Sequence, residues 1–114
     1  MNETSARAPA FTLAALSIEA EAEADRIAAR MRDILRGDLR KRGFVIGISG
    51  GIDSAVCAAL AVRAVGPERV FGLLMPEHDS DPESSRLGEA VAETFGIGHA
   101  VEDIGPALDA MGCY

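Results

Sequence analysis

The sequence predicts an α/β protein built on a doubly wound parallel sheet, truncated to about three strands with flanking helices. The first observation is a set of short, continuous apolar segments, since strands buried on both faces of a parallel sheet lack strict alternation. The second is that these segments alternate with longer segments of helical periodicity. The third is that glycine or proline stands at most of the boundaries. One domain is expected for 114 residues that are 48% hydrophobic.

The chain is expected to begin with a flexible segment over residues 1–16, followed by the domain over residues 17–114. A helix is predicted from about Ser17 to about Gly43, because apolar residues recur there at roughly helical spacing. This apolar stripe consists of Ile18, Ala22, Ile27, Met31, Ile34 and Leu35. The first strand is predicted directly after it, over residues 44–48.

Residues 43–56 are the most informative segment and read Gly-Phe-Val-Ile-Gly-Ile-Ser-Gly-Gly-Ile-Asp-Ser-Ala-Val. They predict a strand, a tight loop over residues 49–54, and a helix over residues 55–65 that Asp53 and Ser54 are suited to start. Gly50 and Gly51 allow a ligand to approach the backbone closely, and the first turn of a helix offers free N–H groups at a positive dipole end.

We therefore interpret residues 49–54 as a phosphate-binding loop, with the hydroxyl groups of Ser49 and Ser54 as further donors. The alternative is that the glycine pair only makes a tight turn into the helix. The loop is not a Walker A sequence, because no Gly-Lys-Ser/Thr follows, and it does not match Gly-x-Gly-x-x-Gly.

The rest of the chain continues the same alternation. A strand is predicted over residues 70–75, ended by Pro76. The acidic residues 77–82 are expected to form a loop at the same sheet edge as residues 49–54, because both segments follow strands. A helix is predicted over residues 83–95, with Leu87, Val91 and Phe95 inward and Gly96 at its end. A short strand over residues 100–104 and a short helix over residues 107–111 complete the pattern.

The charge distribution argues against general nucleic-acid binding. The net charge is −7, and residues 43–114 hold eleven acidic and only three basic residues. Seven of the eleven basic residues lie between Arg26 and Arg42, in a segment without an aromatic residue for base stacking. We interpret this segment as a solvent-exposed helix face with opposite charges at helical spacing, such as Glu23 and Arg26. A polyanion site is the alternative.

Several other classes of function are not indicated. No segment has the apolar length of a membrane span, and the N-terminus lacks a secretory pattern, so a cytoplasmic protein is expected. Cys57 and Cys113 predict neither a disulfide framework nor a metal site. His78 is interpreted as an exposed loop residue rather than a metal ligand. His99 and Tyr114 are given no functional role.

The run Ser-Gly-Gly-Ile-Asp-Ser after a strand resembles the pyrophosphate loop of the N-type ATP pyrophosphatases, the PP-loop superfamily, which has an adenine nucleotide alpha hydrolase-like, Rossmann-like fold. Residues 27–104 further resemble the N-terminal part of NAD synthetase. Three features carry this match: the helix leading into residues 43–56, the strand end Leu74-Met75-Pro76 followed by Ser80 and Ser84, and the helix end Phe95-Gly96-Ile97. GMP synthetases and tRNA-thiolating enzymes share the first loop but usually end the next strand in an acidic residue. One departure is Leu87-Gly88, where the family commonly has an acidic residue and alanine.

The resemblance implies a ligase that amidates nicotinic acid adenine dinucleotide to NAD through an adenylated intermediate, releasing AMP and pyrophosphate. ATP and Mg²⁺ are the implied cofactors, Asp53 the implied metal ligand, and no catalytic residue is required from the protein. Leu74 and Met75 are expected beside the adenine. Ammonia is expected free or from a separate partner, since no amidase domain precedes the loop, and a homodimer is implied. The residues implied to bind ATP and pyrophosphate are Gly47, Ile48, Ser49, Gly50, Gly51, Ile52, Asp53 and Ser54.

Three strands are too few for a complete site of this class. In the strand order 3-2-1-4-5-6, ligands bind at the reversal beside strand one. Without strand four, Val45, Ile46 and Ile48 would form an unprotected edge. We therefore expect an incomplete, inactive piece of the enzyme. The alternatives are a nonenzymatic nucleotide-binding module, or another amidating or thiolating ligase of the superfamily, such as a GMP synthetase-like enzyme. Helix capping is an equal alternative for Ser80 and Ser84.

Overall fold

Three parallel strands form the sheet of this protein in the order β1-β2-β3, as the sequence predicts. The structure is a computed structural model that describes residue 8 and residues 10–114. The strands are β1 (Phe44–Gly47), β2 (Val70–Leu74) and β3 (Gly98–Val101). The helices are α1 (Ala20–Asp33), α2 (Ile52–Val65), α3 (Pro82–Phe95) and α4 (Gly105–Ala110).

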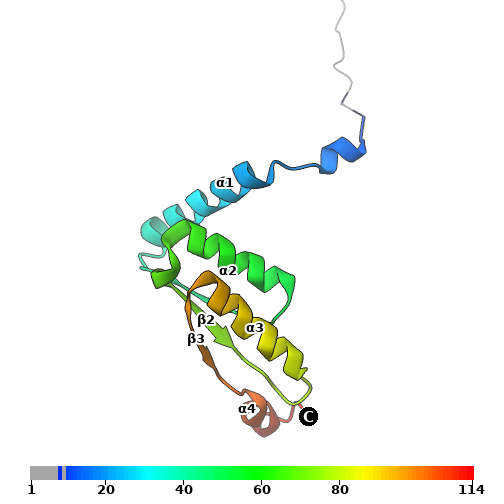
Figure 1. The fold of residues 1–114 in the computed structure, drawn as a ribbon, viewed down its shortest axis with the longest axis vertical. Helices are drawn as coiled ribbons and strands as arrows, with labels where there is room; N and C mark the ends of the chain where they lie inside the picture. Colours follow the sequence, from blue (N-terminus) through cyan, green and yellow to red (C-terminus); the bar gives the residue numbers. More distant parts are fainter. Residues whose placement is uncertain (1–7, 9) are drawn as a thin grey trace, which may run out of the picture.

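One face of the sheet is covered by α2 and α3 (Figure 1). Side chains from the sheet and from these two helices meet there in a core of Ile48, Ala61, Val70, Leu74, Ala92 and Ile97. Gly72 in the central strand leaves the space that two of these side chains fill, because a β-carbon at this position would be 2.6 Å from Ile48 Cδ1 and 3.4 Å from Ile97 Cδ1. The core is therefore small and closely packed.

β1 is an edge strand among the described residues, as expected. It pairs with β2 in the register Val45 to Phe71, and the pairing continues one residue further where Ile48 N–H donates to the Leu73 carbonyl at 2.9 Å. Val45 is 69% exposed on the uncovered face. Ile48 also lies on this unpaired edge through its backbone, while its side chain is only 4% exposed because it points toward the helices.

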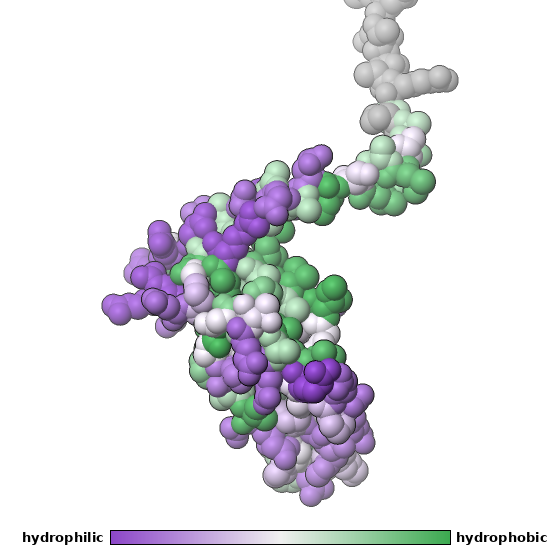
Figure 2. Space-filling view, in the orientation of Figure 1, coloured by the Kyte–Doolittle hydropathy of each residue, from purple (hydrophilic) through white to green (hydrophobic). Residues whose placement is uncertain are grey.

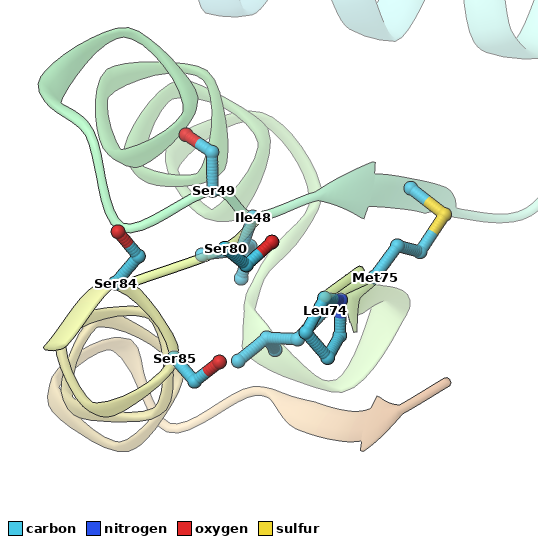
Figure 3. Close-up of a pocket in the computed structure, with 8 residues that line it drawn as sticks. Ile48, Ser49, Leu74, Met75, Ser80, Ser84 and Ser85 are labelled. Carbon is cyan, nitrogen blue, oxygen red and sulfur yellow. The ribbon is translucent and has the colours of Figure 1, made fainter. Parts of the chain in front are cut away.

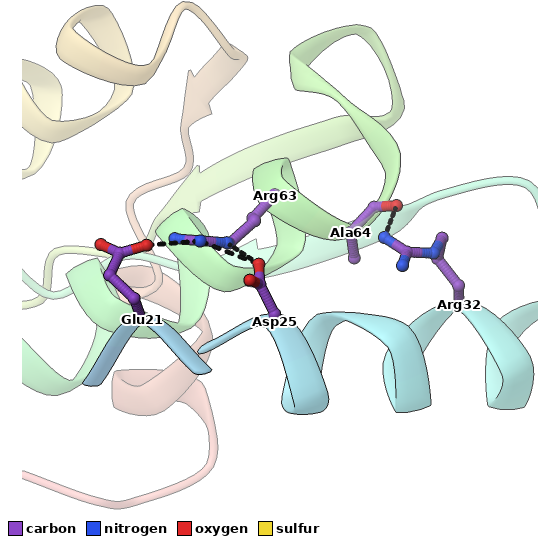
Figure 4. Close-up of polar contacts among 5 residues, drawn as sticks. All are labelled: Glu21, Asp25, Arg32, Arg63 and Ala64. Atoms are coloured by element: carbon purple, nitrogen blue, oxygen red, sulfur yellow. Dashed lines mark hydrogen bonds and ion pairs between the residues drawn. The ribbon is translucent and has the colours of Figure 1, made fainter. Parts of the chain in front are cut away.

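α1 packs against α2 rather than against the sheet (Figure 4). Arg63 in α2 forms ion pairs with Glu21 at 2.6 Å and Asp25 at 2.8 Å, and Arg32 Nη1 donates to the Ala64 carbonyl at 3.1 Å. Arg26 is paired with Glu23 on the exposed side of α1. These pairs support the interpretation of the basic segment as a charged helix face.

The first predicted helix differs from the observed one in three ways. It begins at Ala20 rather than near Ser17, and a π-helical turn, Ile34–Asp38, ends it before Gly43. Ile18 is 72% exposed and Ala22 is exposed, because this end of α1 extends beyond the sheet (Figure 1). Ala28 and Leu35 are the residues that become buried.

The other predicted elements are present with shifted boundaries. β2 ends at Leu74, so Met75 follows the strand, and β3 lies over Gly98–Val101 instead of residues 100–104. α4 begins at Gly105, two residues before its predicted start. α3 is close to its prediction and ends at Gly96, which has a φ of 67°. The prediction of Leu87 as inward is wrong: it is 40% exposed, and Gly88 and Ala92 face the core instead.

The segment before α1 carries several apolar side chains that are exposed to solvent (Figure 2). A 3-10 turn, Leu13–Leu16, buries none of its residues, and Phe11 is also exposed. Residues 1–7 and 9, within the segment expected to be flexible, lie outside the described residues. None of the helices in the described part of the chain is both long and apolar enough to cross a membrane.

Candidate functional site

The loop between β1 and α2 starts the helix earlier than the sequence predicts. α2 begins at Ile52, with Gly51 as its N-cap in an extended conformation. Asp53 and Ser54 therefore lie inside the first turn rather than in front of the helix. Gly51 can take the N-cap position because glycine is accepted there almost as well as the short polar residues.

Two serine hydroxyl groups form hydrogen bonds within the loop and fix its conformation. Ser49 N–H donates to Ser54 Oγ at 3.1 Å, Gly51 N–H donates to Ser49 Oγ at 3.2 Å, and the two oxygens are 3.1 Å apart. Ser54 Oγ also donates to the Gly51 carbonyl at 3.3 Å. Both serines predicted to bind phosphate thus lie together and shape the loop itself.

The remaining backbone donors of the loop are free. The first hydrogen bond of α2 runs from Ala55 N–H to the Gly51 carbonyl. Among the residues that the structure describes, no partner accepts from the N–H groups of Gly50, Ile52, Asp53 or Ser54. Free N–H groups at the positive end of a helix dipole favour an anion. This geometry fits the predicted phosphate-binding loop.

Gly50 brings the loop into contact with α3. Its φ is +85°, and a β-carbon there would lie 2.4 Å from the Ser84 carbonyl oxygen. A side chain at residue 50 would therefore clash with the backbone of α3 and be strained in the left-handed region. The sequence predicted a close approach between this loop and a ligand, whereas the structure adds a close approach to a second helix.

A pocket of about 170 Å³ lies beside this contact (Figure 3). The ends of β1 and β2 and the start of α3 supply its lining, which confirms that the two loops share one edge of the sheet. Leu74 is almost fully buried in its wall, while Met75 is 45% exposed at its rim. The lining residues are Ile48, Ser49, Leu74, Met75, Pro76, Ser80, Ser84 and Ser85.

The serines of this pocket do not cap α3. Asp81 is the N-cap, and its Oδ1 accepts from Glu83 N–H at 2.9 Å. Ser80 Oγ accepts from Glu77 N–H at 3.0 Å within the preceding loop. The helix-capping alternative for Ser80 and Ser84 is therefore wrong. Ser85 also lines the pocket and was not predicted from the sequence, where its only signal is its place next to Ser84 in the first turn of a helix.

Asp53 is the acidic residue of the phosphate-binding loop and is exposed. No group of three or more histidine, cysteine, aspartate or glutamate residues in the described part of the chain could hold a metal ion. Mg²⁺, however, is commonly held by one or two carboxylates together with substrate phosphates and water. A single carboxylate in this loop fits that arrangement, in which the phosphates supply most of the ligands.

Tyr114 is the main contact that sequence reasoning missed. Its hydroxyl group donates to Glu77, and its ring lies on that of His78 with centroids 4.5 Å apart. The hydrogen bond from Tyr114 lowers the pKa of the Glu77 carboxyl, assisted by the Asp79 backbone N–H. Desolvation raises the pKa of the Tyr114 phenol, and the bond to Glu77 adds to this effect. No sequence pattern linked residues this far apart.

The free N–H groups and the pocket meet at the carboxyl edge of a parallel sheet. Open α/β domains bind their ligands at this edge, and phosphate groups are bound at helix N-termini in many of them. The fold and the site together define the class as an α/β domain with a loop at the start of a helix whose free N–H groups can accept an anion.

Comparison with known proteins identifies the family within this class. The family model of NAD synthase matches residues 25–113, so the chain belongs to the NAD synthase family. It is 66% identical over 104 residues to the NH3-dependent NAD+ synthetase of Rhizobium meliloti, covering 91% of this chain and 31% of that protein. The chain thus spans about a third of the length of this curated relative.

Two solved structures share the fold. The NMN synthetase of Francisella tularensis superposes with a TM-score of 0.78 at 29% identity, over 85% of this chain and 40% of that one. The glutamine-dependent NAD+ synthetase of Acinetobacter baumannii, solved with adenosine diphosphate, gives a TM-score of 0.75 at 27% identity, over 91% of this chain and 19% of that one. The predicted fold and family are therefore confirmed.

Proposed function

We propose that this chain forms the ATP-binding part of an ammonia-dependent NAD synthetase. The single observation that carries the proposal is the set of four free N–H groups at the start of α2, beside the pocket at the ends of β1 and β2. Family membership supports it, and the adenosine diphosphate complex of the Acinetobacter baumannii relative makes an adenine nucleotide the expected ligand.

The proposed reaction has two steps. The nicotinate carboxylate of nicotinic acid adenine dinucleotide attacks the α-phosphorus of ATP, a P–O bond forms, and the bond to the β-phosphate breaks to release pyrophosphate. Ammonia then attacks the activated carboxyl carbon, loses a proton, and displaces AMP to give the amide. Since both nucleophiles come from substrates, the protein contributes by orientation and by charge stabilisation.

The residues of the loop have distinct parts in this proposal. The free N–H groups of Gly50, Ile52, Asp53 and Ser54 would hold the pyrophosphate as its charge develops. Ser49 and Ser54 hydroxyls keep the loop in shape, and each would donate to phosphate by exchanging its present hydrogen bond within the loop. Mg²⁺, when bound, would neutralise phosphate charge, and Asp53 would hold it.

The pocket would receive the adenine end of ATP. Ile48, Leu74 and Met75 supply apolar surface, and Gly47 leaves room for Met75, whose Cε lies 3.4 Å from the place of a β-carbon at residue 47. Ser84 and Ser85 add hydroxyl groups to its lining. Apolar walls with a few polar groups are typical of sites for heterocyclic ligands.

A second candidate is nucleotide binding without turnover. The pocket of about 170 Å³ is smaller than the roughly 300–1,000 Å³ of complete small-molecule sites. Among the described residues, no strand pairs with the outer edge of β1. Protein therefore lines the site on one side only. We propose that the 114-residue chain binds ATP but is inactive by itself.

Calorimetry with ATP in the presence and absence of Mg²⁺ tests the proposal first. Binding that depends on Mg²⁺ is expected, and no binding would overturn the assignment. An assay of AMP release with ammonia then tests turnover with three acceptors: nicotinic acid adenine dinucleotide, nicotinic acid mononucleotide and xanthosine monophosphate. Release with the first supports NAD synthetase, while release with only one of the others reassigns the substrate. Binding without release is expected of the 114-residue chain by itself, and the same result from a longer protein that contains this chain would support the second candidate.

Three further expectations belong to this proposal. The enzyme is proposed to be a cytoplasmic homodimer, and the domain is proposed to begin at residue 17, after a flexible segment. Sedimentation equilibrium of the chain tests the dimer, and limited proteolysis tests the boundary, with cleavage before residue 17 as the expected result.

A further inference from the structure

The loop after β2 forms a compact turn beside the pocket. Glu77 N–H donates to Ser80 Oγ at 3.0 Å, and Ser80 N–H donates back to the Glu77 carbonyl at 3.1 Å. Ser80 lines the pocket, as do Met75 and Pro76 just ahead of the turn. The conformation of Glu77 therefore determines where Ser80 lies.

Tyr114 contacts this turn from a distant part of the chain. Its hydroxyl group donates to Glu77 Oε2 and accepts from His78 N–H at 3.3 Å. The other carboxylate oxygen, Glu77 Oε1, accepts from Asp79 N–H at 3.1 Å. The Tyr114 ring also covers that of His78, with centroids 4.5 Å apart and planes tilted by 60°. One phenol thus reaches two consecutive residues of the turn.

On the outside, the turn has one other close contact, with the start of α4, where His78 Cε1 lies 3.4 Å from the place of a β-carbon at Gly105. His78 and Asp79 are exposed, and the hydrogen bond from Ile104 N–H to the Pro76 carbonyl holds only the start of the loop. Tyr114 is itself held through the end of α4, where Cys113 N–H donates to the Leu108 carbonyl at 3.0 Å. The contact therefore links the turn to a helix that takes no part in the pocket lining.

We propose that Tyr114 is a positioning residue that fixes the Glu77–Ser80 turn and, through it, one wall of the nucleotide pocket. This inference deepens the proposed ATP-binding function and rests on it. Tyr114 does not touch the pocket itself, so its effect on nucleotide affinity is carried by Glu77 and Ser80. Because the turn is exposed and small, a bond at its outer side limits its alternative conformations.

Tyr114→Phe tests the inference in the 114-residue chain, because it keeps the ring on His78 and removes only the hydroxyl group. Amide hydrogen exchange at His78 and Asp79, measured by NMR without nucleotide, is expected to become at least about threefold faster. The Kd for Mg-ATP, measured by calorimetry, is expected to rise about three- to tenfold, because both hydrogen bonds of the hydroxyl group to the turn are lost.

Two further variants separate positioning from a general loss of structure. Thr94→Val removes a hydroxyl group that donates to the Ala90 carbonyl in α3, away from the turn, and should leave both readouts unchanged. Glu77→Gln keeps an acceptor for Tyr114 and should bind Mg-ATP more tightly than Glu77→Ala.

Unchanged exchange at His78 and Asp79 in Tyr114→Phe would overturn the inference. So would equal Mg-ATP affinity in the two proteins when the unsubstituted chain binds. If the unsubstituted chain does not bind Mg-ATP, the proposed function fails, and the exchange rates alone decide whether Tyr114 positions the turn.

Discussion

Gly50 lies directly against the backbone of Ser84, with the Ser84 carbonyl oxygen 2.4 Å from the place of a β-carbon at residue 50. The first residue belongs to the loop after β1 and the second to the first turn of α3 after β2. This contact joins the phosphate-binding loop to the helix that supplies the serines of the pocket. Glycine at residue 50 is thus required by the packing of the loop against α3, whether or not a ligand is bound.

Gly50→Ala is expected to destabilise the protein by about 2–4 kcal/mol, because left-handed strain of about 1–2 kcal/mol adds to the overlap with the Ser84 backbone. Mg-ATP binding should weaken by at least about tenfold, since the loop must move away from α3. Urea unfolding and calorimetry measure the two effects.

Gly96→Ala provides the matched control, because Gly96 also has a positive φ, of 67°, but nothing lies within 4 Å of its β-carbon position. It should cost only about 1–2 kcal/mol and leave nucleotide affinity unchanged. Equal stability losses in the two variants would contradict the role given to the Gly50–Ser84 contact.

Gly88→Ala is expected to destabilise the protein by about 1 kcal/mol in total. This net loss already includes the preference of a helix for alanine over glycine, which by itself would stabilise the protein by a similar amount. The β-carbon would lie 2.9 Å from Leu74 Cδ2 and 3.3 Å from Ile48 Cγ2, and both of these side chains are buried in the core. Gly37→Ala, which meets nothing within 4 Å, should instead be neutral or stabilising. Thermal unfolding of the two variants gives the comparison, and a stabilised Gly88→Ala protein would show that the core has room here.

Asp53→Asn is expected to leave the fold intact and to weaken Mg²⁺-dependent ATP binding by about tenfold or more, because the exchange removes the carboxylate proposed to hold the metal ion. Binding without Mg²⁺ should change less, and can even improve, since a carboxylate close to phosphates repels them. Asp33→Asn in α1 is the control for the loss of one exposed charge. Mg²⁺-dependent binding equal to that of the unsubstituted chain would remove Asp53 from the metal site.

The phenol of Tyr114 is expected to ionise above the usual value near 10, because desolvation and the bond to Glu77 both raise its pKa. A raised pKa means that folding favours the protonated phenol. The resulting stability is therefore fully present below pH 10 and is lost as the pH rises through the pKa in the folded protein. The facing groups are Glu77, His78 and Asp79.

Absorbance at the tyrosinate band measures this titration without interference, because Tyr114 is the only tyrosine and the chain has no tryptophan. Glu77→Gln should lower the midpoint toward 10. A midpoint at or below 10 in the unsubstituted chain would contradict the hydrogen bond between Tyr114 and Glu77.

Local sequence patterns predicted the order of elements and the position of the loop because these depend on short-range physics. Apolar segments rich in Phe, Val, Ile and Leu indicated the first two strands, and Gly96 indicated the end of α3 through its left-handed conformation. The run from Ser49 to Ser54 indicated a helix start that binds an anion. The observed starts of α2 and α3 lie three residues and one residue before the predicted ones, because several adjacent residues are acceptable as caps.

The sequence by itself determined the alternation of strands and helices, the position of the loop at residues 49–54 and the family. Only the tertiary structure decided that Leu87 is exposed while Gly88 faces Leu74, that Gly50 contacts Ser84, and that Tyr114 holds Glu77. The physical reason is that periodicity and capping act between neighbours along the chain. The contacts of Gly50, Gly88 and Tyr114 instead depend on how helices, strands and loops pack in space, which no local pattern encodes.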